Sequence, residues 1–85
     1  MKEVKIYTTQ SCPFCVKAKR LLQRKGVEYE ELRVDLKPEL IAEAVEKSGG
    51  LRTVPQIFIG DHHVGGCDEL YDLEGQNRLD SILSE

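Results

Sequence analysis

The chain has 85 residues, 40% of them hydrophobic and 32% charged, which is ordinary for one globular domain spanning 1–85. Its net charge of −3 and its few aromatic residues exclude the basic, aromatic-rich footprint of a nucleic-acid-binding protein. No run approaches the roughly 20 apolar residues of a membrane span and the N-terminus lacks a signal-peptide core, so we expect a cytoplasmic protein without membrane or nucleic-acid partners.

The chain opens with a predicted strand and helix. Alternating apolar residues indicate a short strand over 2–8. Apolar residues at helical spacing predict an amphipathic helix over 13–25, which Gly26 ends. The apolar face of this helix contains Phe14, Ala18, Leu21 and Leu22.

A second strand and a second helix follow. The strand is predicted over 27–36, although its alternation slips phase within that range. Pro38 begins the helix and Gly49 with Gly50 ends it. Its buried stripe is predicted to contain Leu40, Ile41, Ala44 and Val45. A strand, a helix and a strand in so few residues imply a parallel strand pair with a right-handed crossover.

The second half of the chain predicts a hairpin and further helical turns. Strands over 56–59 and 62–64 flank Gly60–Asp61, a two-residue turn with glycine first, as a type II′ hairpin requires. A helix is predicted from about 68 to 74, interrupted near Gly75. A short helix after it buries Leu79, Ile82 and Leu83. The order β-α-β-α-β-β-α predicts an α/β fold, a mixed sheet with helices on both faces.

Two cysteines separated by two residues lie between the predicted first strand and first helix, which is typical of a redox motif. Pro13 suits the first helical position, so Cys12 becomes the helix cap. A thiolate there faces unpaired backbone N–H groups and the positive end of the helix dipole, so we expect a depressed pKa for Cys12, within about 3.5 to 7.5. Cys15 lies on the same face inside the first turn and should be less exposed and less acidic. The sequence therefore predicts that Cys12 attacks and Cys15 resolves.

A run of basic residues without an acid occupies 16–25, the remainder of this helix. One interpretation is a solvated face whose last-turn cations complement the helix dipole. The other interpretation is electrostatic attraction of an anionic substrate toward Cys12. The two interpretations do not exclude each other.

Three short motifs together resemble the glutaredoxin family, which has the thioredoxin fold. The motifs are Cys12-Pro13-Phe14-Cys15, Thr53-Val54-Pro55-Gln56-Ile57-Phe58-Ile59 and Gly65-Gly66-Cys67-Asp68. They stand in the family's order and spacing, and the resemblance covers essentially the whole chain, as in small bacterial-type dithiol glutaredoxins. It implies a thioredoxin-like fold with a four-stranded mixed sheet, a glutathione-dependent thiol–disulfide oxidoreductase and, we expect, a monomer.

The resemblance also implies which residues bind glutathione. In the family the bond before the second motif's proline is cis, so the backbone of Val54 would turn toward Cys12 and pair with glutathione as an added strand would. At the last motif, the N–H groups of Cys67 and Asp68 would hold the γ-glutamyl carboxylate, and the Asp68 carboxylate would hold its ammonium. Two simpler interpretations stay open, a loop proline before an edge strand and an Asp68 that only caps its helix. The expected glutathione-binding residues are Phe14, Arg52, Thr53, Val54, Pro55, Gly66, Cys67 and Asp68.

The chain departs from the family pattern at two positions. Many members carry a lysine three residues before the first cysteine, where this chain has Thr9. Glutathione affinity or thiol acidity is therefore expected to be lower, unless Arg52 or Lys17 supplies the charge. Phe14 replaces the usual tyrosine and keeps a ring beside the cysteine, so we expect only a minor effect from that change.

The third cysteine, Cys67, has two interpretations, a buried packing residue or a regulatory thiol that is open to glutathionylation. The total of three cysteines is odd and too small for a secreted disulfide framework, which favours a reducing compartment. His62 and His63 are expected to be hairpin residues on opposite sides of the sheet.

The leading function is the reduction of protein disulfides and glutathione mixed disulfides, with glutathione as co-substrate and no bound cofactor or metal. Expected partners are glutathione and disulfide-containing or glutathionylated proteins, with ribonucleotide reductase a candidate at family level. A thioredoxin-like electron donor fed by a thioredoxin reductase would share the fold but would not need the Asp68 site. A zinc site using Cys12, Cys15 and Cys67 with a histidine lacks a second Cys-x-x-Cys half-site. Pro13 argues against the iron–sulfur cluster known in glutaredoxins that lack this proline.

Overall fold

A mixed β-sheet forms the centre of the computed structural model, which describes residues 2–84. Across the sheet the strands follow the order β2-β1-β3-β4. Strand β1 (Val4–Thr8) runs parallel to β2 (Glu30–Arg33) and antiparallel to β3 (Gln56–Ile59). Strand β4 (His62–Gly65) pairs antiparallel with β3. The predicted mixed four-stranded sheet is confirmed.

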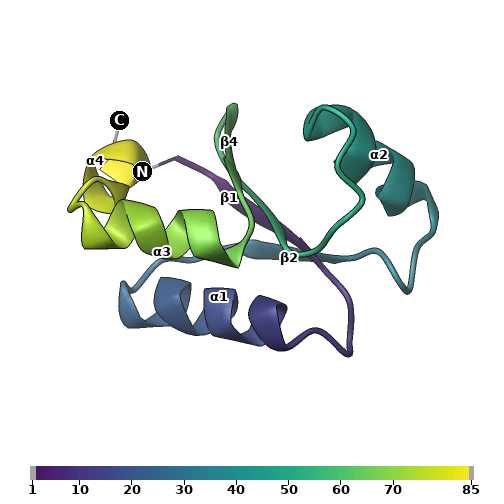
Figure 1. Ribbon diagram of the computed structural model, residues 1–85, viewed down its shortest axis with the longest axis horizontal. Helices are drawn as coiled ribbons and strands as arrows, with labels where there is room; N and C mark the ends of the chain where they lie inside the picture. The colour runs from purple at the N-terminus through teal and green to yellow at the C-terminus, as the bar shows by residue number, and fades with distance from the viewer. Residues whose placement is uncertain (1, 85) are drawn as a thin grey trace.

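Helices cover both faces of this sheet, as predicted (Figure 1). They are α1 (Pro13–Arg24), α2 (Glu39–Lys47), α3 (Cys67–Gly75) and α4 (Leu79–Ser84). Helices α1 and α3 lie side by side on one face, and α2 lies apart from them (Figure 1). Within residues 2–84, none of the helices has the length and apolar character needed to cross a membrane.

Two apolar clusters form the core, one on each face of the sheet, because successive side chains of a strand point to opposite faces. From β1, Ile6 joins the cluster of α1, α3 and α4, and its neighbour Tyr7 joins the cluster of α2. The first cluster contains Val4, Ile6, Ala18, Leu21, Leu22, Val27, Ile57, Ile59, Val64, Cys67, Leu70, Leu79 and Leu83. The second contains Tyr7, Val34, Ala44 and Phe58.

The second strand is shorter than predicted, because it begins at Glu30 rather than Val27 and ends at Arg33 rather than Leu36. The Val27 N–H donates to the Leu22 carbonyl at 3.0 Å, so it closes the end of α1 and does not enter the sheet. Beyond Arg33 the chain turns, with the Leu36 N–H bonded to the Arg33 carbonyl at 3.2 Å. This turn leaves Leu36 68% exposed.

The predicted apolar helix faces are partly wrong. Phe14 is 58% exposed, and Cys15 is the buried residue of the first turn that precedes Ala18. In α2 only Ala44 of the predicted stripe is buried, and Ile41 is 43% exposed. The cluster under α2 is small, so this helix buries a narrower face than its sequence allows.

Two turns in the second half have positive φ angles. Gly60 has a φ of +58° at the first position of the turn between β3 and β4, as a type II′ hairpin requires. Asn77, with a φ of +59°, separates α3 from α4 in the left-handed conformation that asparagine tolerates. Gly75 still belongs to α3, so the predicted interruption lies two residues later in the chain.

Candidate active site

Cys12 and Cys15 lie at the start of α1 and form a disulfide, with their Cα atoms 5.2 Å apart. Cys12 is the N-cap of the helix, and its Sγ accepts a hydrogen bond from the Cys15 N–H at 3.1 Å. Pro13 follows at the start of the helix, as predicted. Cys15 is 1% exposed and Cys12 is 9% exposed. Cys12 is therefore the sulfur nearer the surface, at a helix end that favours a thiolate.

The loop before β3 meets Cys12 at one edge of the sheet. The Val54 carbonyl oxygen lies 3.7 Å from Cys12 Sγ. The peptide bond between Val54 and Pro55 is cis, as the resemblance implied. The Val54 N–H has no hydrogen-bond partner among residues 2–84. Because β1 and β3 are antiparallel, the end of β1 lies beside the start of β3. The segment with Cys12 follows the first of these ends, and Val54 and Pro55 precede the second.

The Glu69 side chain caps the N-terminus of α3. Gly66 is the N-cap of this helix, and its N–H donates to Glu69 Oε1 at 2.7 Å. Asp68 is exposed and makes no side-chain hydrogen bond or ion pair within the described part of the chain. Asp68 therefore does not cap the helix, and its carboxylate is available to a ligand.

A groove of about 200 Å³ brings together residues of α1, the loop before β3 and the start of α3. Every expected glutathione-binding residue lines this groove except Arg52. The lining residues are Phe14, Leu51, Thr53, Val54, Pro55, Gln56, Gly66, Cys67, Asp68 and Glu69. We call this space the α1–α3 groove.

Three residues that line the α1–α3 groove are not predicted by the sequence. Gln56 is polar yet 2% exposed, and the available signal is a polar side chain beginning an otherwise apolar strand. Glu69 lies three residues after the N-cap Gly66, which is the spacing of a capping box. Leu51 is an exposed apolar residue after two glycines, and its sequence context carries no signal.

Arg52 and Thr9 lie in a neighbouring cavity of about 220 Å³. Leu51, Thr53 and Val54 line both this cavity and the α1–α3 groove, so they form the wall between the two spaces. Arg52 therefore lines the same cavity as Thr9, the position at which the sequence is expected to depart from the family pattern. Its contact with glutathione stays a prediction.

Cys67 is a free thiol that is 4% exposed and belongs to the larger core cluster. Burial raises the pKa of the Cys67 thiol above its usual value, and the nearby carboxylates Asp68 and Glu69 raise it further, against an opposing effect of Lys17. A buried thiol with a raised pKa is protonated and unreactive at neutral pH. The structure favours the packing interpretation of this cysteine.

Some cations of the basic run in α1 are held by acids of other elements. Lys19 Nζ lies 2.9 Å from Glu31, and Lys25 Nζ lies 2.9 Å from Glu74 and 2.8 Å from Asp80. These pairs join α1 and its C-cap Lys25 to β2, α3 and α4, so Lys19 and Lys25 have partners within the fold.

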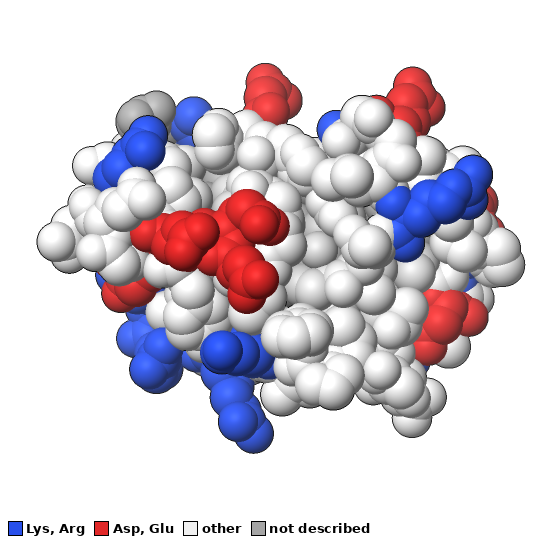
Figure 2. Space-filling model, in the orientation of Figure 1, with Lys and Arg blue, Asp and Glu red and all other residues white. Residues whose placement is uncertain are grey.

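The exposed charges of α1 and α3 form two neighbouring patches of opposite sign (Figure 2). Figure 2 shows acidic side chains over α3 and basic side chains below them, over α1. The exposed charged residues of these helices include Asp68, Glu69, Asp72, Lys17, Arg20 and Arg24. Because Asp68 and Glu69 also line the α1–α3 groove, its α3 wall is acidic and complements a ligand's ammonium group.

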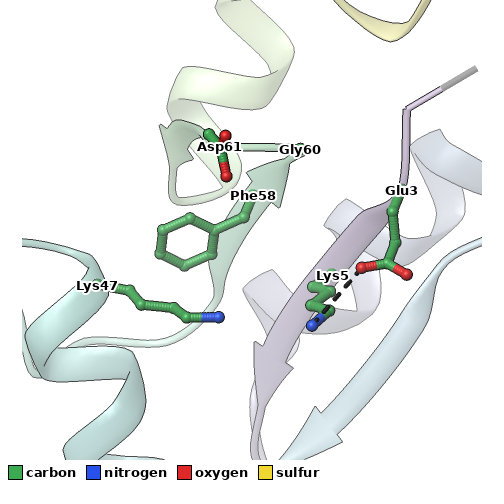
Figure 3. Close-up of a pocket in the computed structure, with 6 residues that line it drawn as sticks. All are labelled: Glu3, Lys5, Lys47, Phe58, Gly60 and Asp61. Atoms are coloured by element: carbon green, nitrogen blue, oxygen red, sulfur yellow. Dashed lines mark ion pairs between the residues drawn. The ribbon is translucent and has the colours of Figure 1, made fainter.

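A separate cavity of about 310 Å³ lies beside Glu3 and Lys5, near the start of β1 (Figure 3). Cys12 follows the other end of that strand. The lysines of this cavity are engaged, since Lys5 lies 3.6 Å from Glu3 and Lys47 lies 3.8 Å from Glu43. Its lining residues are Glu3, Lys5, Lys47, Phe58, Gly60 and Asp61. No cysteine lines it, so the α1–α3 groove beside Cys12 is the candidate active site.

The residues proposed for a zinc site do not gather in one place. Among residues 2–84, no three His, Cys, Asp or Glu side chains are grouped so that they could hold a metal ion. Cys67 belongs to the core, and His63 is engaged with Gln56 at 2.7 Å. The zinc alternative needs Cys12, Cys15, Cys67 and a histidine together, and residues 2–84 contain no such group.

Comparison with known proteins gives consistent results for sequence and structure. Residues 4–64 match the family model described as Glutaredoxin. A glutaredoxin of Pseudomonas aeruginosa is 57% identical over 84 residues, covering 99% of both chains. The solution structure of a Brucella melitensis glutaredoxin has a TM-score of 0.84 at 55% identity, over 98% of this chain and 89% of that chain. A buckwheat glutaredoxin–glutathione complex has a TM-score of 0.88 at 27% identity, over 98% and 77%. These similarities confirm the predicted thioredoxin-like fold.

Proposed function

The chain belongs to the glutaredoxin family, and from this premise we propose that it is a glutathione-disulfide oxidoreductase with Cys12 as nucleophile and Cys15 as resolving thiol. Family membership makes it a glutathione-dependent thiol–disulfide oxidoreductase. The observation that carries the assignment of roles is the position of Cys12. It caps α1, it is the more exposed sulfur of the pair, and it lies 3.7 Å from the Val54 carbonyl at the wall of the α1–α3 groove.

Glutathione in the α1–α3 groove would meet three complementary groups. The unpartnered Val54 N–H would pair with the backbone of the glutathione cysteine, as in an added strand. The first N–H groups of α3, those of Cys67 and Asp68, have no partner within the helix and hold the γ-glutamyl carboxylate. The Asp68 carboxylate takes the ammonium. A peptide backbone, a carboxylate and an ammonium on one small molecule fit this groove.

Reduction of a glutathionylated protein needs one cysteine. The Cys12 thiolate attacks the glutathionyl sulfur, a new S–S bond forms to Cys12, and the client protein leaves as a thiolate that takes up a proton. The thiolate of a second glutathione then attacks the bound glutathionyl sulfur. Cys12 is released as a thiolate, and the two glutathiones leave as glutathione disulfide.

Reduction of a protein disulfide uses both cysteines. Cys12 first forms a mixed disulfide with the client and releases the client's other sulfur. Cys15 then attacks Cys12 Sγ, which releases the second client thiol and leaves the Cys12–Cys15 disulfide. Two glutathiones reduce that disulfide. Disulfide-containing and glutathionylated proteins are therefore the proposed partners.

The test is turnover of a glutathione mixed disulfide in the presence of glutathione, glutathione reductase and NADPH. Wild type and Cys15→Ser should be active, and Cys12→Ser should be inactive, because only Cys12 is needed. With a protein disulfide as substrate, Cys15→Ser should lose activity as well. Asp72→Asn is the control, at an exposed position of α3 that does not line the groove, and it should keep both activities.

The opposite results have distinct meanings. Activity of Cys12→Ser would contradict the assignment of the nucleophile. A wild type that is inactive with glutathione but is reduced by thioredoxin reductase would contradict the proposed function and favour the thioredoxin-like electron donor.

A further inference from the structure

Gln56, the first residue of β3, connects the α1–α3 groove to strand β4 through its buried amide. Its Nε2 donates to the Thr53 carbonyl oxygen at 3.0 Å and lies 3.1 Å from Thr53 Oγ1. Its Oε1 lies 2.7 Å from Nε2 of His63 on β4. All the polar ends of this amide are engaged, so its orientation is fixed.

The direction of each hydrogen bond follows from what each atom can do. A carbonyl oxygen only accepts, so the NH₂ end of Gln56 must face Thr53. The Oε1 end therefore faces His63 and accepts, so His63 Nε2 carries the proton. Both the neutral Nε2–H form and the imidazolium of His63 supply this donor.

The imidazole of His63 is held in place by the core beneath α2. It stacks on Phe58, with ring centroids 4.8 Å apart and an interplanar angle of 25°. Phe58 in turn meets the buried Tyr7 edge-on, at 5.7 Å and 83°. Phe58 and His63 are also paired in the register of β3 and β4. The donor atom therefore has a position set by the sheet rather than by a mobile side chain.

The fixed carbonyl of Thr53 determines the direction of the next N–H. Atoms of a peptide unit lie in one plane, and in a trans unit the carbonyl and the following N–H point to opposite sides. The unit between Thr53 and Val54 is trans. While Gln56 holds the Thr53 carbonyl, the Val54 N–H is turned away from Gln56 and is free of partners among residues 2–84.

We infer that His63 and Gln56 are positioning residues, which hold the Thr53–Val54 peptide so that the Val54 N–H is presented to glutathione. The inference rests on the proposed function, in which that N–H pairs with the glutathione backbone. Neither side chain exchanges electrons or protons with the substrate. Their effect is on recognition, and the reactivity of Cys12 does not depend on them.

Two variants of His63 separate its donor from its ring. His63→Phe keeps a ring that can stack on Phe58 but has no N–H. His63→Gln places an N–H at a similar reach but has no ring. We expect His63→Phe to raise the KM for a glutathione mixed disulfide about five-fold, the equivalent of one hydrogen bond, with kcat unchanged. His63→Gln should keep the KM within about two-fold of wild type.

A second readout does not use activity. Exchange of the Gln56 side-chain NH₂ protons with solvent, followed by NMR, should be slow in wild type and His63→Gln and fast in His63→Phe. Equal KM values and equal exchange in the two variants would overturn the inference, as would a KM increase in both that follows a loss of thermal stability. A wild type inactive toward the mixed disulfide would contradict the proposed function instead, and the exchange experiment would still test the hydrogen-bond chain.

Discussion

Asp68 and Glu69 are neighbouring carboxylates at the start of α3, and the structure gives them different surroundings. Glu69 accepts the Gly66 N–H at 2.7 Å and is satisfied by the protein. Asp68 lines the α1–α3 groove and has no hydrogen bond or ion pair elsewhere in residues 2–84. An anion at a helix N-terminus is stabilised by the dipole, so this position of the Asp68 side chain suits a contact with a cationic group.

Removal of the Asp68 charge should weaken glutathione recognition. A hydrogen bond to a charged group contributes about 1.5 kcal/mol, so Asp68→Asn should raise the KM for a glutathione mixed disulfide about ten-fold with little change in kcat. Asp72→Asn is the matched control, since Asp72 is exposed on the same helix and does not line the groove. Steady-state kinetics at several substrate concentrations separate the two parameters. A tenfold effect of both substitutions would indicate a long-range charge effect rather than a contact.

The reduced protein should show one acidic thiol. Cys12 caps α1, where unpaired N–H groups stabilise its thiolate, so its pKa should lie below the usual value of about 8.5. Cys15, at 1% exposure, should titrate higher. The measurement is the rate of alkylation against pH, with the modified cysteine identified by mass spectrometry, in a Cys67→Ser background. Faster alkylation of Cys15 at pH 6 would reverse the assigned roles.

The sequence predicts those site residues whose interaction partners are close to them in the chain. Cys12, Pro13 and Cys15 are explained by helix geometry alone. Gln56 is not predictable in the same way, because its partner His63 lies on another strand and becomes adjacent only through the pairing of β3 and β4.

Between elements, Glu31 forms a junction of α1, β1 and β2. Its Oε2 accepts from Lys19 Nζ at 2.9 Å and from the hydroxyl of the fully buried Thr8 at 2.7 Å. The Lys19 hydrogen bond, followed by that of Thr8, lowers the pKa of Glu31 below its usual value, against an opposing effect of burial. The junction ties the helix of the cysteines to the sheet.

Glu31 should stabilise the fold only while it is ionised. A carboxyl whose folded pKa is lowered contributes stability above its unfolded pKa of about 4.3, and the contribution is lost as pH falls through the folded pKa. Glu31→Gln should therefore cost about 1 kcal/mol at pH 7, a difference that shrinks below pH 4.3. Denaturant unfolding of wild type and Glu31→Gln at pH 7 and below pH 4.3 measures this difference in the free energy of unfolding. Glu28→Gln, at an exposed position without an ion pair in residues 2–84, is the control, and an equal loss there would remove the junction from the explanation.

Element boundaries were predictable where a local signal stops the element. Gly26 ended α1 in both the sequence and the structure, and the type II′ turn needed only Gly60. The ends of β2 were not predictable from the sequence. The length of this strand depends on the residues of β1 that pair with it, Lys5 to Thr8. The exposure of Ile41 likewise depends on the small area of sheet beneath α2.

For the molecule as a whole, stability depends on the cluster that joins the C-terminal helix to the sheet. Leu79 is fully buried in that cluster, although it lies near the end of the chain. Leu79→Ala should destabilise the fold by about 2–5 kcal/mol, the usual cost of such a cavity, which is a large share of a small domain's stability. Leu36→Ala, at a residue 68% exposed, should change stability by less than about 0.5 kcal/mol. Thermal and denaturant unfolding compare the two, and similar losses would contradict the described packing.

The antiparallel pairing of β1 and β3 brings together two parts of the site that can change separately during evolution. The proposed nucleophile, Cys12, belongs to the segment before Gly49, whereas the loop before β3 and the start of α3, which line most of the groove, belong to the segment after Gly50. The proposed reactivity and most of the proposed recognition are thus encoded in separate halves of the chain, and they meet where the end of β1 lies beside the start of β3. Exchange of the second half between homologous proteins would transfer ligand preference while leaving the chemistry in place.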